Sequence, residues 1–142
     1  MDNAVSHGMP ALALTDRNNL YGAIEFYKTC EKKEIKPIIG CDLDVAVRGN
    51  DVHLIFLAEN NAGYQNLLKL VSDAHLENRG EAPRANEAAL QTYAAGLIVL
   101  VPESAMRAGN SLITFLTKTY GTNNVFARIG WNGGTEGMKK AQ

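Results

Sequence analysis

The stretch that decides the fold is residues 36–57, KPIIGCDLDVAVRGNDVHLIFL. Two runs rich in β-branched and large apolar residues, 37–47 and 52–57, stand on either side of a polar segment at 48–51. That segment, RGND, has the composition of a tight turn. The pattern therefore predicts a β-hairpin, and the rest of the chain can be interpreted outward from it.

Strands and helices alternate on both sides of the hairpin. Upstream, after a short helix that Gly8 stops, we expect a strand at 11–15 and then a helix that Asn18 or Asn19 caps and that ends near Glu34. Such alternation is typical of an α/β fold with a largely parallel sheet, and no linker divides residues 1–142, so a single domain is expected. Downstream, the expected elements are a helix capped by Asn60, a loop at 78–86, a helix at 87–93, a strand at 97–101, a helix at 109–120 and a strand at 125–129.

Composition excludes several classes of protein. The net charge is −1, whereas a domain that grips nucleic acid by itself usually carries a basic excess. No apolar run approaches the roughly 20 residues that span a bilayer, and the start of the chain lacks a secretory signal, so a cytoplasmic protein without membrane contact is expected. Cys30 and Cys41 have no metal-binding spacing and are expected to be reduced thiols in the core.

Three segments carry a resemblance to a known family. They are residues 8–27, beginning GMPALALTDRNNLYG, residues 35–42, IKPIIGCD, and residues 53–70, which contain HL, LAEN and GYQNLLKL. In order and spacing they resemble the PHP (polymerase and histidinol phosphatase) domain of bacterial DNA polymerase III alpha subunits. The resemblance implies a PHP-type distorted β/α barrel, incomplete here because the first strand and the last motif are missing. Active members of that family hold metal ions at one end of the barrel and use them on phosphoesters.

Most of the metal ligands that the resemblance implies have no counterpart in this sequence. Only Asp16, Asp42 and His53 place a donor at a matching position. Arg17 stands where the family has a histidine, and a guanidinium cannot bind a metal because it has no free lone pair. One hypothesis is charge replacement, in which Arg17 pairs with Asp16, Asp42 or Asp44.

Two roles are open for His53, metal ligation and a structural hydrogen bond to Asp44. If the hairpin turns at residues 49–50, Asp42 lies opposite Leu57, well away from His53 along the sheet. Asp44 is then a diagonal neighbour of His53. This register favours the structural role.

Later positions also depart from the family pattern. Pro102-Glu103 stands where a cysteine or histidine is common, and residues 131–133, WNG, replace Asp-His-Gly. Trp131 is expected to pack against the last strand, ahead of a glycine-rich tail. The remaining histidines and two serines are interpreted as surface residues and helix caps, namely His7, His75, Ser104 and Ser111.

The resemblance implies that the chain is part of a replicative DNA polymerase III alpha subunit, a DNA-directed DNA polymerase. We expect a catalytically inert structural or interaction module. Its expected partner is the remainder of that subunit, and a proofreading exonuclease subunit is a further candidate partner. The module is expected to reach DNA only through the parent polymerase. No cofactor is expected, but zinc or manganese would bind if the site were competent. The alternatives are a metal-dependent phosphoesterase or 3′–5′ proofreading exonuclease of the PHP family, and a partner-binding α/β module with an open sheet edge.

Overall fold

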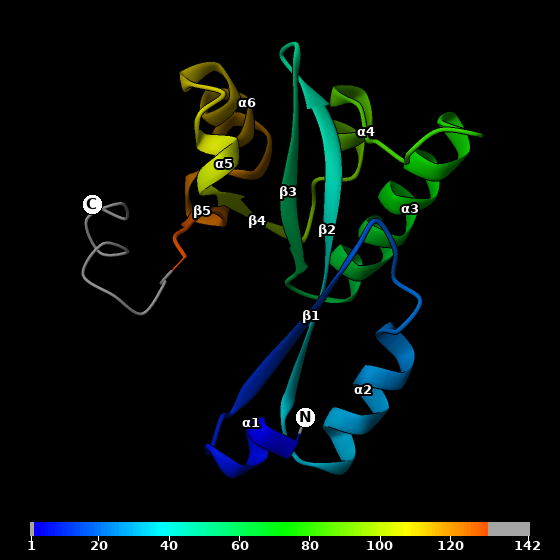
Figure 1. The fold of residues 1–142 in the computed structure, drawn as a ribbon, viewed down its shortest axis with the longest axis vertical. Coiled ribbons are helices and arrows are strands. Elements are labelled where there is room, and N and C mark those ends of the chain that lie inside the picture. The colour runs from blue at the N-terminus through cyan, green and yellow to red at the C-terminus, as the bar shows by residue number, and fades with distance from the viewer. Residues whose placement is uncertain (1, 131–142) are drawn as a thin grey trace.

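A computed structural model describes residues 2–130 and shows an α/β fold around a five-stranded sheet that does not close (Figure 1). The strands follow one another across the sheet in the order β1-β2-β3-β4-β5. They are β1 (Ala11–Arg17), β2 (Lys36–Val47), β3 (Asn50–Ala58), β4 (Leu97–Pro102) and β5 (Val125–Arg128). The helices are α1 (Asp2–Ser6), α2 (Ala23–Lys32), α3 (Asn61–Glu77), α4 (Glu87–Thr92), α5 (Glu103–Met106) and α6 (Asn110–Tyr120), with a 3-10 turn at Thr122–Asn124.

The sheet is mixed, so the expectation of a largely parallel sheet was wrong. β1 runs parallel to β2 and β4 runs parallel to β5, whereas β2–β3 and β3–β4 are antiparallel. The predicted hairpin reverses the chain between β2 and β3, and the long connection through α3 and α4 reverses it again. The open sheet is consistent with an incomplete distorted barrel.

One face of the sheet carries the main core. Successive residues of a strand point to opposite faces, so Cys41, Leu43 and Val45 share a face with Leu54 and Phe56 of β3. These side chains are fully buried and pack in one cluster with residues of α3, α4 and α6. Asp42 and Asp44 of β2 therefore point to the opposite face, which the main core cluster leaves open.

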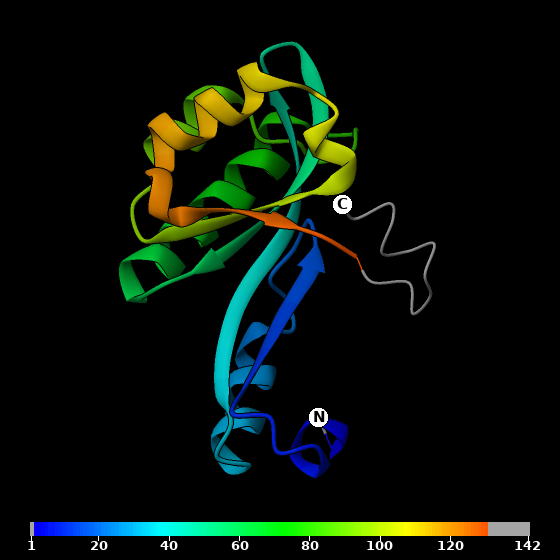
Figure 2. The ribbon, with the colours of Figure 1, turned by 90° about the vertical axis from the view of Figure 1, so that its left-hand side faces the viewer.

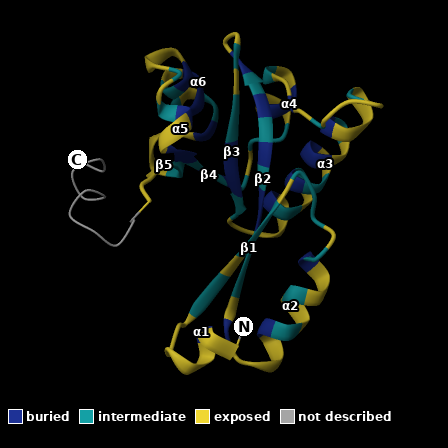
Figure 3. Ribbon diagram, viewed as in Figure 1, coloured by how far each residue is buried: buried dark blue, intermediate teal, exposed yellow. Residues whose placement is uncertain are grey.

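The N-terminal part of the molecule extends away from the main core as an arm. It consists of α1, β1, the start of β2 and α2, as the two ribbon views show (Figures 1 and 2). Its own small cluster contains Ala4, Cys30 and Ile35, with Leu12 and Phe26 packed against them. Figure 3 shows the buried residues concentrated around β2, β3 and β4, while the helices of the arm are mostly exposed.

Both cysteines are free and buried, as predicted. Cys30 lies in the small cluster of the arm and Cys41 lies in the main core. Burial raises the pKa of the Cys41 thiol to about 12, so this group stays protonated near neutral pH.

The hairpin is present, but its turn is formed by Arg48 and Gly49 and not by residues 49–50. Both have left-handed backbones, with φ of 51° and 77°, and Val47 pairs with Asn50. A two-residue turn of this kind needs positive φ at both central positions, and Gly49 fills the second. Arg48 is held in the first because its backbone N–H donates to Glu87 Oε1 (2.6 Å) and its guanidinium lies 5.3 Å from the centre of the Phe115 ring.

The start of α2 also differs from the prediction. Neither Asn18 nor Asn19 caps it, and the helix begins at Ala23 after Gly22. The backbone N–H of Asn18 instead donates to the carbonyl of Asp42 (2.8 Å), which fixes the connection after β1 against β2. Asn19 accepts a hydrogen bond from the Tyr21 N–H (3.2 Å) and so forms a local turn.

Other local predictions have mixed outcomes. Asn60 caps α3 as predicted, because its side-chain oxygen accepts from the Gly63 N–H (2.8 Å). The loop at 78–86 lies partly beside β2, where Ala85 exchanges backbone hydrogen bonds with Asp44 and Ala46. The short helix α5 was not predicted. Trp131 and the glycine-rich tail lie outside the described residues.

Candidate functional site

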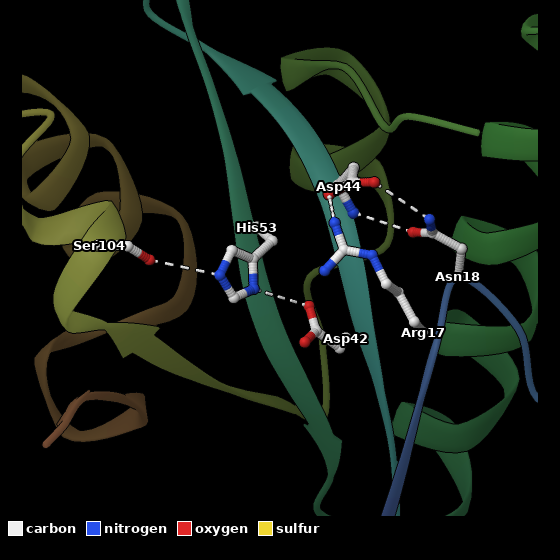
Figure 4. A network of polar contacts seen from close by, with 6 residues as sticks. All are labelled: Arg17, Asn18, Asp42, Asp44, His53 and Ser104. Carbon is white, nitrogen blue, oxygen red and sulfur yellow. Dashed lines mark hydrogen bonds and ion pairs between the residues drawn. The ribbon is translucent and has the colours of Figure 1, made fainter. Parts of the chain in front are cut away.

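A polar cluster on the open face of the sheet brings together side chains from β1, β2, β3 and α5 (Figure 4). Nδ1 of His53 lies 2.9 Å from Oδ1 of Asp42, and its Nε2 lies 3.3 Å from Oγ of Ser104. The predicted hydrogen bond between His53 and Asp44 was wrong. His53 lies directly opposite Asp44 in the register, but its ring bonds to the diagonal Asp42 because other groups occupy Asp44.

Arg17 and Asn18 occupy both oxygens of Asp44. Nη2 of Arg17 donates to Oδ1 at 2.7 Å, and Nδ2 of Asn18 donates to Oδ2 at 3.1 Å. The backbone N–H of Asp44 donates in return to Oδ1 of Asn18 (3.0 Å). Of the three carboxylates considered as partners of Arg17, the structure therefore selects Asp44. The pair is partly exposed, at 59% for Arg17 and 29% for Asp44.

The three predicted metal ligands do not converge. Asp42 and His53 are in contact, but Asp16 pairs with Cys41 in the register and so lies on the opposite face of the sheet. A Cβ placed on Gly22, before α2, would lie 3.4 Å from Oδ2 of Asp16, which agrees with that placement.

Zinc in proteins is held by three or four protein ligands. Within residues 2–130, no group of three histidine, cysteine, aspartate or glutamate side chains is placed to hold a metal ion. The described residues therefore do not fit the metal cluster that the resemblance implies. Joint binding of a metal ion by Asp16, Asp42 and His53 stays a prediction.

The contact of Ser104 with His53 was not predicted from the sequence. This serine was predicted to be a helix cap, but the N-cap of α5 is Pro102 and Ser104 turns its hydroxyl towards His53. No local pattern signals this contact, because it depends on the pairing of β3 with β4. Ser111 is not a cap either, since α6 follows Gly109.

The two other histidines make backbone contacts. His7 is exposed and its Nδ1 lies 2.6 Å from the carbonyl oxygen of Asn3 in the preceding helix, in agreement with a surface residue near the helix end. His75 is also exposed on α3, as expected, but its Nε2 lies 2.6 Å from the carbonyl oxygen of Asn18. This second contact ties α3 to the connection after β1, at Asn18 of the polar cluster.

Two open pockets meet at His53 and Ser104. The larger, about 490 Å³, also has Arg17 and Arg84 on its wall, and the smaller, about 270 Å³, has Arg128. Arg84 pairs with Asp51 at 3.0 Å. Small polar molecules can therefore approach the His53–Ser104 contact from solvent, where guanidinium groups and carboxylates both line the pockets. No described helix is both long and apolar enough to cross a membrane.

Comparisons with known proteins agree with the resemblance. Residues 1–127 match the PHP domain family. DNA polymerase III subunit alpha of Chlamydia trachomatis is 46% identical over 108 residues, covering 68% of this chain and 9% of that protein. The subunit from Thermus aquaticus is 44% identical over 103 residues, covering 64% and 8%. The chain thus spans about a tenth of the length of these relatives.

Solved structures show the same fold at low identity. A protein from Bifidobacterium adolescentis described as a candidate metal-dependent phosphoesterase has a TM-score of 0.65 at 10% identity, covering 99% of this chain and 74% of that one. An amidohydrolase from Chromobacterium violaceum has a TM-score of 0.63 at 14% identity, covering 98% and 73%. With the family match over most of its length, the chain belongs to the PHP domain family.

Proposed function

We propose that the chain is part of the PHP domain of a DNA polymerase III alpha subunit and serves there as a structural module, without the metal-dependent phosphoester chemistry of active family members. The relatives at 40–46% identity are DNA polymerase III alpha subunits, which supports the proposal that the chain is part of such a subunit. In this proposal the module packs against the remainder of the subunit in the cytoplasm, with a proofreading exonuclease as a further partner, and reaches DNA only through the polymerase.

The ion pair between Arg17 and Asp44 carries this proposal. The guanidinium lies 2.7 Å from a carboxylate on the open face, two residues along β2 from Asp42. A fixed positive charge at that place repels a metal cation and also occupies a carboxylate that could bind one. Arg17 therefore offsets the negative charge of the cluster, as bound cations do in active members.

The contact between Asp42 and His53 favours a second candidate, a metal-dependent phosphoesterase or 3′–5′ exonuclease. A carboxylate bonded to one nitrogen of a histidine often orients the other nitrogen towards a metal. Here the other nitrogen lies 3.3 Å from Ser104 instead. A catalytic metal would need further donors beside this pair.

Metal content decides between the two candidates. The chain would be purified without chelators, analysed for metal by elemental analysis, and titrated with zinc and with manganese by calorimetry. We expect less than stoichiometric metal in the wild-type chain and in Arg17→His, because a restored histidine still lacks partners. Arg84→His, at the wall of the same pocket, is the matched control. Stoichiometric zinc in the wild-type chain, or its recovery in Arg17→His alone, would overturn the structural role.

A further inference from the structure

Asp42, His53 and Ser104 form one hydrogen-bonded chain from β2 through β3 to α5 (Figure 4). An ionised carboxylate can only accept, so a neutral His53 ring carries its proton on Nδ1, where Asp42 lies. The lone pair on Nε2 then faces the hydroxyl of Ser104. In this tautomer Nε2 can take the serine proton, and the imidazolium that forms remains beside a carboxylate.

The same groups are accessible from solvent. The side chain of His53 is 30% exposed and that of Asp42 is 19% exposed. Ser104 and His53 both line the 490 Å³ pocket and the 270 Å³ pocket. A small molecule can therefore reach Oγ of Ser104, and a leaving group has space to depart.

The charges around the two pockets indicate what kind of molecule fits. The larger pocket is lined by Arg17 and Arg84 but also by Asp44, Asp51 and Glu81, so its charges balance or are slightly negative. The smaller pocket is lined by Arg128 and Glu103. Among residues 2–130, Arg128 takes part in no ion pair, whereas Arg17 and Arg84 each have one. Guanidinium groups bind phosphate and carboxylate through strong charge-assisted hydrogen bonds.

We infer that Ser104 is a nucleophile, activated by His53 and Asp42, that accepts an acyl group from activated esters or acyl phosphates with an anionic group. In that step a bond forms between Oγ and the acyl carbon, and the bond to the leaving oxygen breaks. The Oγ proton passes to Nε2 of His53 and from there to the leaving group. The products are an acyl-serine and the released alcohol or phosphate, and no metal or oxidant takes part.

Covalent labelling in the presence of EDTA tests the nucleophile. A fluorophosphonate probe forms an Oγ–P bond and releases fluoride, and peptide mass spectrometry locates the adduct. We expect one adduct per chain at Ser104, none in Ser104→Ala, and a labelling rate roughly 100-fold lower in His53→Gln, the contribution typical of a general base. Ser111→Ala, which removes a serine on α6, should label like the wild-type chain.

Several outcomes would overturn the inference. They are no adduct, adducts spread over several serines, or an unchanged labelling rate in His53→Gln. If circular dichroism shows His53→Gln to be misfolded, Asp42→Asn takes its place, because an amide preserves the shape and removes the carboxylate. Since EDTA is present throughout, a failure here is independent of the metal measurement that tests the structural role.

The preference for anionic substrates is tested with acetyl phosphate and with p-nitrophenyl acetate. The rate at which each reagent acylates Ser104 is measured by peptide mass spectrometry. We expect Arg128→Gln to lower the rate with acetyl phosphate relative to the rate with p-nitrophenyl acetate, because acetyl phosphate is an anion and p-nitrophenyl acetate is neutral. An unchanged ratio would overturn the assignment of anionic substrates.

Discussion

At the scale of single residues, Arg17 shows how one side chain changes the chemistry of the open face. It places a permanent cation, which binds Asp44, at the position where the resemblance implies a histidine. We predict that Arg17→Glu lowers the free energy of unfolding by roughly 1 kcal/mol, since a partly exposed ion pair is lost and two carboxylates are brought together. Urea unfolding followed by circular dichroism measures this change.

Arg84→Glu is the matched control for this prediction. Its pair with Asp51 has a similar length, 3.0 Å, but Asp51 is 72% exposed, so solvent screens the interaction more strongly. The loss of stability should be smaller than for Arg17→Glu. Equal losses in the two variants would show that Arg17 has no special role in the cluster.

The sequence allowed part of this site to be predicted. The motifs shared with the family pointed to Asp42 and His53, whose role as metal ligands with Asp16 stays a prediction, and the hypothesis that Arg17 pairs with a nearby carboxylate is confirmed for Asp44. Strand alternation alone separates Asp16 from Arg17, because neighbouring residues point to opposite faces. Ser104 could not be found in this way, because it lies 51 residues from His53 and only the pairing of β3 with β4 brings them together.

At the scale of secondary-structure elements, the cap of α3 is predicted to contribute to stability. Oδ1 of Asn60 accepts from the Gly63 N–H at 2.8 Å, and the next residue, Asn61, is the first residue of the helix. Asn60→Ala should lower the free energy of unfolding by about 1 kcal/mol, the usual contribution of such a cap, whereas Asn61→Ala should have little effect. Thermal and urea unfolding compare the two, and equal effects would contradict the role of the cap.

The presence of the hairpin was easier to predict than the register in which its two strands pair. The expected turn at 49–50 and the observed turn at 48–49 differ by two residues in the pairing of β2 with β3. A shift of two leaves every side chain on the same face, so the alternating pattern fits both registers. The choice depends on backbone conformation at Arg48 and on its contacts with α4 and α6, which the local sequence does not show.

At the scale of the whole molecule, the open face of the sheet is the main surface that lacks a packing partner among residues 2–130. Beside the polar cluster it carries apolar side chains that the main core does not cover among residues 2–130, namely Ile38, Leu57, Ile98, Leu100 and Phe126. The described part of the chain also leaves β1 and β5 as sheet edges. Solved relatives of this fold extend beyond the matched region, since the chain covers only 73–74% of each.

An open apolar face with unpaired edges predicts association between copies of the isolated chain. We expect the mass measured by size-exclusion chromatography with light scattering to rise with protein concentration. Phe126, 50% exposed on β5, should contribute, so Phe126→Lys should weaken the association by about tenfold or more, in line with the 1.5–3 kcal/mol of burying such a ring. Tyr21→Lys, at an 87% exposed residue after β1, is the control. A monomer at every concentration would mean that the open face is covered within the chain itself.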